Sequence, residues 1–194
     1  MNNAYARKAT LLLFISRLLI LQHCLSVTGA SETFSCARWT LLQTCPHVLS
    51  DKDIFDILFR QIRRLRHHSE IGLSEFVTDL FESTRESIIK HGCLPRIEAD
   101  TRLLVVLDEA QILGDAFNAS FQSMPSSDES PRPLLSPILN AFRDIGGHQL
   151  TLVACGTGLS INTLFWVQSS GLVSRTALLP LRYAVQNAFI GLLL

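Results

Sequence analysis

Arg102–Gln111 reads RLLVVLDEAQ, and this stretch decides the fold that the chain is expected to adopt. Its five consecutive aliphatic residues, 103–107, are typical of a strand in the centre of a parallel sheet that is covered on both faces. An amphipathic helix would instead carry a polar residue at every third or fourth position. Two carboxylates, Asp108 and Glu109, follow the strand directly. Because parallel sheets carry their chemistry at the carboxyl ends of their strands, we expect both acids to lie at a site.

A second apolar run, 150–155, also predicts a buried strand, and it ends in the small and polar residues 156–158. The sequence before it predicts a helix over 136–145, with a proline in its first turn and two glycines after its end. Two strands joined through a helix form a right-handed parallel crossover, so the ends of both strands should share one edge of the sheet. The sequence therefore predicts an α/β fold, a partial parallel sheet flanked by helices.

The strand that ends in Asp108 and Glu109 resembles the Walker B element of P-loop NTPases, in particular the AAA-like and STAND-like ATPases. The resemblance implies that Asp108 is a metal residue, which holds Mg²⁺ through its waters. It implies that Glu109 is the catalytic residue, which orients or deprotonates the attacking water. The second strand looks like the neighbouring sensor strand, which implies that Thr157 binds the cofactor by sensing its terminal phosphate. Mg²⁺ and ATP are the cofactors that follow from this resemblance.

One departure from the family limits what the resemblance implies. No Gly-x-x-x-x-Gly-Lys-[Ser/Thr] sequence occurs in the 194 residues. The backbone nest and the lysine that cradle phosphates in that family are therefore missing, and with them most of the nucleotide affinity. We expect an incomplete P-loop NTPase-like domain, derived from a nucleotide-dependent switch or an AAA-like ATP hydrolase, that is weak or inactive by itself. The alternative for the two acids is the start of a helix after the strand, where carboxylates interact favourably with the helix dipole.

Composition narrows the class of protein. A hydrophobic content of 47% with 18% charged residues excludes a wholly disordered chain. The 17 basic residues balance 17 acidic ones, so no nucleic-acid partner is indicated. The five cysteines are odd in number and lack metal-ligand spacing, which indicates reduced thiols and an intracellular, cytoplasmic location. The partners that we expect are other proteins or a second copy of the chain, because an incomplete core exposes apolar strand edges.

Residues 1–30 admit two interpretations. Their basic start, apolar middle and small-residue end have the three parts of a secretory signal peptide. However, Arg17 divides the apolar run into pieces too short to span a bilayer, and the apolar residues follow helical spacing. We favour a buried or amphipathic core helix in which Ser16 and Arg17 face outward, and we then expect no membrane association. The alternative is a secreted or membrane-associated, non-enzymatic protein with an N-terminal targeting segment.

The remaining domain boundaries follow from periodicity and composition. The P-loop NTPase-like core is expected over 31–170. Within it, a helix begins near residue 54 and another covers 73–89, with Gly72 breaking the pattern between them. The far half of the first helix, 60–68, contains four arginines and two histidines. We interpret these cations as stabilising the end of the helix. The alternative is that they contact phosphate or the acids of a partner.

Three further segments carry weaker patterns. The segment 37–43 predicts a short helix or an edge strand, with Trp39 packed in the core. Residues 122–137 are rich in serine and proline, which predicts a flexible insertion. Residues 171–194 form an apolar C-terminal tail in which no further pairing of a strand with a helix is evident.

Overall fold

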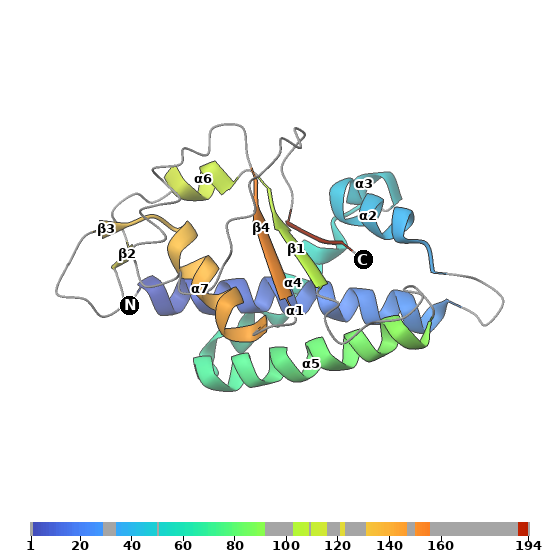
Figure 1. Ribbon diagram of the computed structural model, residues 1–194, viewed down its shortest axis with the longest axis horizontal. Coiled ribbons are helices and arrows are strands. Elements are labelled where there is room, and N and C mark those ends of the chain that lie inside the picture. Colours follow the sequence, from blue (N-terminus) through green and yellow to red (C-terminus); the bar gives the residue numbers. More distant parts are fainter. Residues whose placement is uncertain are drawn as a thin grey trace.

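The computed structural model describes residues 2–28, 34–49, 51–91, 103–108, 110–115, 121–122, 131–146, 150–155 and 190–193, and it is mostly helical (Figure 1). The described helices are α1 (Asn2–Val27), α2 (Cys36–Thr44), α3 (Pro46–Leu49), α4 (Ile54–Ile62), the 3-10 helix η1 (Arg63–His67), α5 (Glu70–Lys90), α6 (Ala110–Asp115) and α7 (Leu135–Gly146). The described strands are β1 (Leu103–Leu107), β2 (Phe121–Gln122), β3 (Pro131–Arg132), β4 (Leu150–Ala154) and β5 (Ile190–Leu193).

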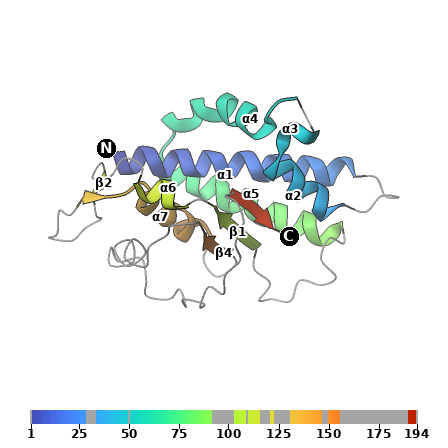
Figure 2. The same ribbon diagram turned by 90° about the horizontal axis from the view of Figure 1, so that it is seen from above.

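Helix α1 is the centre of the fold. Helix α4 lies along one side of it, α7 and the sheet lie on the opposite side, and α5 runs beside it (Figures 1 and 2). Buried residues occur at every turn of α1 between Ala6 and Leu25. A helix that is apolar on all sides is typical of complete burial in a core or of a membrane span. By length and composition alone α1 could cross a membrane, but in this structure it is the core helix.

The prediction that Ser16 and Arg17 face outward is wrong. Ser16 has no exposed surface, and its hydroxyl donates to a backbone carbonyl one turn earlier. The guanidinium carbon of Arg17 lies 4.8 Å from the centre of the Phe55 ring, and that ring packs edge-on against Trp39. Burial lowers the pKa of Arg17, while the charge of Asp53 raises it. An aromatic face and a carboxylate thus accommodate a cation in the middle of an apolar helix.

The sheet contains the parallel pair that the sequence predicts. Strand β1 pairs in parallel with β4, from Leu103 opposite Leu150 to Leu107 opposite Ala154. On its other edge β1 pairs antiparallel with β5, which gives the strand order β4-β1-β5. Strand β5 comes from the predicted C-terminal tail, whose structure the sequence left open. The coarse α/β class is therefore confirmed, with a small mixed sheet in place of a purely parallel one.

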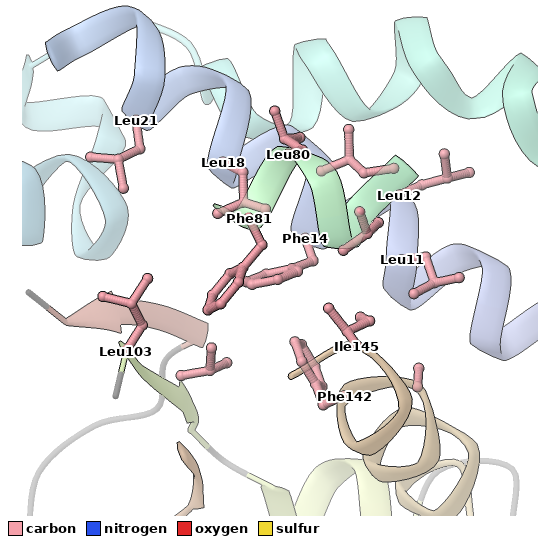
Figure 3. Close-up of a cluster of buried hydrophobic side chains, with 14 of the residues drawn as sticks. Leu11, Leu12, Phe14, Leu18, Leu21, Leu80, Phe81, Leu103, Phe142 and Ile145 are labelled. Carbon is pink, nitrogen blue, oxygen red and sulfur yellow. The ribbon is translucent and has the colours of Figure 1, made fainter. Parts of the chain in front are cut away.

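Strand β1 is not buried equally on both faces, so that part of the prediction is wrong. Burial alternates along the strand, with Leu103, Val105 and Leu107 buried and Leu104 and Val106 half-buried. The buried face meets the hydrophobic core, and Figure 3 shows Leu103 in the same cluster as the aromatic rings. There Phe14 of α1 contacts Phe81 of α5 and Phe142 of α7. The sheet is thus fixed against the helices through one face.

Side-chain caps begin α4 and α5. The Asp53 carboxylate accepts hydrogen bonds from the amides of Phe55 and Asp56, at 2.9 and 3.1 Å. The Ser69 hydroxyl accepts a hydrogen bond from the amide of Gly72 at 3.0 Å, which satisfies a free donor of the first turn of α5. Gly72 therefore lies inside the helix, and the predicted break at this residue is wrong.

The described part of the predicted insertion 122–137 has regular structure. Strands β2 and β3 pair antiparallel, with Phe121 opposite Arg132, and α7 already begins at Leu135. Arg132 is buried. At these positions the loop prediction is wrong, whereas residues 123–130 lie outside the described residues. The segment 37–43 lies in α2, which selects the helical alternative for it.

Candidate edge site at Asp108

Strands β1 and β4 end side by side, as the sequence predicts. Beyond their last paired residues, the amide of Cys155 donates a hydrogen bond to the carbonyl of Leu107 at 2.8 Å. The amide of Ala110 then donates to the carbonyl of Cys155 at 2.9 Å. These two bonds hold the chain that leaves β1 against the chain that leaves β4. Asp108 lies between the two attachment points, so its backbone is fixed at the carboxyl edge of the parallel pair.

The thiol of Cys155 faces the carboxylate of Asp108. Its Sγ lies 3.7 Å from Asp108 Oδ1 and 3.6 Å from the carbonyl oxygen of Leu107. Burial raises the pKa of Cys155, and the negative charge and hydrogen bond of Asp108 raise it further. At neutral pH the thiol is therefore protonated and donates to one of these oxygens. Cys155 is a hydrogen-bond donor at this edge and a poor nucleophile.

Of the three predicted site residues, the structure describes Asp108, which is half-buried. Glu109 and Thr157 lie outside the described residues, so their catalytic and phosphate-sensing roles stay predictions. Asp108 offers the hard oxygen that Mg²⁺ prefers, whereas the sulfur of Cys155 is a soft ligand that Mg²⁺ does not favour. In the part of the chain that the structure describes, no group of three or more His, Cys, Asp or Glu side chains surrounds a metal-sized space. The donor set fits one carboxylate contact to Mg²⁺.

The same carboxylate also fits the alternative interpretation. Asp108 comes two residues before α6, which begins at Ala110. A negative charge at that place interacts favourably with the amides of the helix start. If Asp108 contacts Mg²⁺, loss of its carboxylate would weaken metal binding. If it only stabilises the start of α6, the loss would affect the local structure alone. Substitution of Asp108 therefore separates the two roles.

The sequence reasoning did not identify Cys155 as the neighbour of Asp108. A signal for it was present in the predicted parallel pairing. Because the last residue of β1 pairs with the last residue of β4, the residues that follow the two strands lie beside each other. Asp108 and Cys155 are those next residues.

Replacing Asp108 with asparagine should make Cys155 more reactive towards iodoacetamide. The carboxylate raises the pKa of Cys155, so its removal should lower that pKa and increase the fraction of thiolate at pH 8. Peptide mapping by mass spectrometry would follow the alkylation rate of Cys155, with the exposed Cys45 as the internal reference. The exposed acid Asp51 supplies the control Asp51→Asn. An unchanged ratio of the two rates in Asp108→Asn would contradict the contact.

The resemblance to P-loop NTPases stays a prediction, which rests on the residues of the two strands. Comparison of the chain with protein-family models, with curated proteins and with solved structures found no match.

Proposed function

We propose that the chain is a degenerate ATPase-like domain, derived from a nucleotide-dependent switch or an AAA-like ATP hydrolase, and weak or inactive as a hydrolase by itself. The observation that supports the proposal is the parallel pair β1 and β4, whose following segments are hydrogen-bonded to each other around Asp108. Ligands of open α/β sheets bind outside the carboxyl ends of such strands. A carboxylate at that place is the kind of group that contacts Mg²⁺ bound to nucleotide phosphates.

The weakness of the site follows from what the chain does not supply. The sequence contains no glycine-rich loop with a lysine, which in P-loop proteins provides most of the contacts to the phosphates. On its side away from β4, strand β1 pairs with the antiparallel strand β5. An ATP molecule at the carboxyl ends of β1 and β4 would be held mainly through its Mg²⁺ and Asp108. We therefore propose that the domain acts as an interaction module that retains half of a nucleotide site.

Binding of ATP at this edge should require Mg²⁺ and have a dissociation constant of about 1 mM or weaker. Asp108→Asn should abolish the Mg²⁺-dependent part of the binding, while Glu109→Gln should preserve it, because only Asp108 is expected to contact the metal. Titration calorimetry of ATP with and without Mg²⁺ measures both effects, with Asp51→Asn as the matched control. Micromolar, Mg²⁺-dependent affinity that Asp108→Asn removes would show that an unrecognised phosphate loop exists. Equal Mg²⁺-dependent binding in Asp108→Asn would assign the acid to the start of α6.

We also propose that the chain is intracellular and retains residues 1–30. The alternative, a secreted or membrane-associated protein with a targeting segment, is favoured by the length and hydropathy of α1. The intracellular proposal is supported by the burial of α1 in the core and by four free thiols, Cys24, Cys36, Cys45 and Cys155. Free thiols persist in reducing compartments, whereas small secreted domains tend to form disulfides.

A further inference from the structure

A surface cavity of about 270 Å³ lies at the junction of α4 and η1, and the described side chains that line it are all arginine or histidine. These exposed residues are Arg60, Arg63, Arg64, Arg66 and His67. Their spacing of three and four residues brings them to one side of the helical segment. Like charges at this spacing repel each other, and a bound anion would relieve this repulsion.

The acids of the described part of the chain leave most of this charge uncompensated. Asp56 binds Arg60 at 2.8 Å, in a pair whose side chains are 45% and 73% exposed. Glu70, the next acid along the chain, forms its ion pair with Arg7 instead. In the described residues, the other three arginines of the cavity, 63, 64 and 66, form no ion pair. The cavity is therefore strongly cationic.

Stabilisation of the helix end accounts for only part of the cluster. Cations interact favourably with the last turn of a helix, and the effect falls off beyond that turn. Here Lys8 of α1 already donates a hydrogen bond to the carbonyl oxygen of Arg66, at 3.3 Å. Arg60 lies in the last turn of α4, and Arg64, Arg66 and His67 lie in the last turn of η1. Stabilisation of these two helix ends does not explain why their side chains line one common cavity.

We propose that this cavity binds a compact, multiply charged phosphate anion, either free or as the phosphates of a nucleotide. Guanidinium groups match the geometry of phosphate oxygens and form paired, charge-assisted hydrogen bonds with them. The cavity has a volume of about 270 Å³ and is open to solvent, because its described lining residues are all exposed, so it offers room for a small group at the surface. Among the described residues, no apolar side chain lines the cavity to hold a side chain of a bound peptide. Size and lining together favour a small polyanion.

This cavity is separate from the edge site at Asp108. Helix α4 lies on the side of α1 that faces away from the sheet (Figure 2), and η1 continues directly from α4. The arginines therefore do not supply the phosphate contacts that the sheet edge lacks. The two sites should also respond to Mg²⁺ with opposite signs. Mg²⁺ neutralises phosphate and should weaken binding at the arginines, whereas any binding at Asp108 requires it.

Titration calorimetry of the full chain with sodium tripolyphosphate, without Mg²⁺ and at low salt, tests the proposal. We expect a dissociation constant of about 10–100 μM that Arg63→Gln/Arg64→Gln weakens about tenfold or more, because two charged hydrogen-bond donors are lost. Arg38→Gln removes an exposed arginine on α2 and should leave the affinity within about twofold. Asp108→Asn should leave the affinity for tripolyphosphate unchanged. The test of the arginine cavity is therefore independent of the test of the edge site. Circular dichroism of each variant confirms that its helices are retained.

Titrations with further ligands identify which molecule supplies the phosphates and how specific the site is. ATP that binds as tightly as tripolyphosphate supports recognition of the phosphates alone, and tighter binding of ATP identifies a nucleotide as the ligand. Equal affinity for orthophosphate and tripolyphosphate would overturn the proposal, as would an equal loss in Arg38→Gln, because both indicate unspecific attraction. Tighter binding of an acidic peptide or of RNA would also overturn it. So would a salt-dependent dimer that Arg63→Gln/Arg64→Gln dissociates, since the cavity would then receive an acidic face of a second copy.

Discussion

Replacing Phe14 with alanine should lower the free energy of unfolding by about 3–5 kcal/mol. Phe14 is 2% exposed, and it joins three helices. Its ring centre lies 5.3 Å from that of Phe142 in α7, in an edge-on arrangement, and 6.2 Å from that of Phe81 in α5. Alanine would leave a cavity where the three helices meet, because their other contacts prevent them from closing it. Single domains have a total stability of about 5–15 kcal/mol, so the variant would lose a large part of it.

Urea denaturation followed by circular dichroism measures this change. Tyr5→Ala is the matched control, since it removes an aromatic ring from the same helix at a position that is 59% exposed. Its effect should stay within about 0.5 kcal/mol. Equal effects of the two substitutions would contradict the burial of Phe14 between α5 and α7. An unchanged midpoint in Phe14→Ala would contradict the central position of α1.

The pairing of β1 with β4 could be predicted from sequence because both strands are strongly apolar and a helix joins them. The chain between them encodes the crossover locally, in the proline in the first turn of α7 and in the two glycines, the first of which is the last residue of this helix. Strand β5 is different. Its four residues, 190–193, belong to a longer apolar stretch without alternation, and they pair with a strand more than 80 residues earlier. What determines this strand is the open edge of β1, which no local pattern in the tail indicates.

The prediction for Arg17 failed because its partners come from other helices. On α1 alone, a cation is most stable when it faces water, and the sequence gives no reason to bury it. In the fold, α4 brings the Phe55 ring under the guanidinium and the Asp53 carboxylate close to it. Gly72 failed as a helix break for a more local reason. The Ser69 cap begins α5 before this residue, and a glycine in the first turn costs too little to prevent that.

The candidate site was predictable in part. The position of Asp108 follows from the end of an apolar strand, and its place beside the end of β4 follows from parallel pairing. The contact with Cys155 depends on the hydrogen bonds beyond the strands, which sequence patterns do not specify. The arginine cavity was visible only as a basic run along one helix. The common space that these side chains line lies where α4 is followed by η1 at Arg63.

Removal of residues 1–30 should abolish cooperative folding of the rest of the chain. Seven large apolar side chains of α1 are buried in the core, namely Leu11, Leu12, Phe14, Ile15, Leu18, Leu21 and Leu25. Each contributes about 1.5–3 kcal/mol through its burial, so together they match or exceed the whole stability of about 5–15 kcal/mol of a typical domain. The remaining elements contact one another largely around α1, because α4 lies on one side of it and α7 and the sheet on the other. Without α1 these two layers would expose their apolar faces to water.

Expression of residues 31–194 alone, beside the full chain, provides the test. The shortened chain should show no cooperative thermal transition and should bind a dye for exposed apolar surface, whereas the full chain should unfold in one step. The intact mass of the full chain, expressed in cells with a secretory pathway, should include residues 1–30, because cleavage after Ala30 would remove the core helix. A shortened chain that unfolds cooperatively, together with a cleaved mass, would contradict the central role of α1 and favour the secreted alternative. Uncleaved full chain with an unfolded fragment would establish α1 as part of the folded protein and exclude its role as a removable signal.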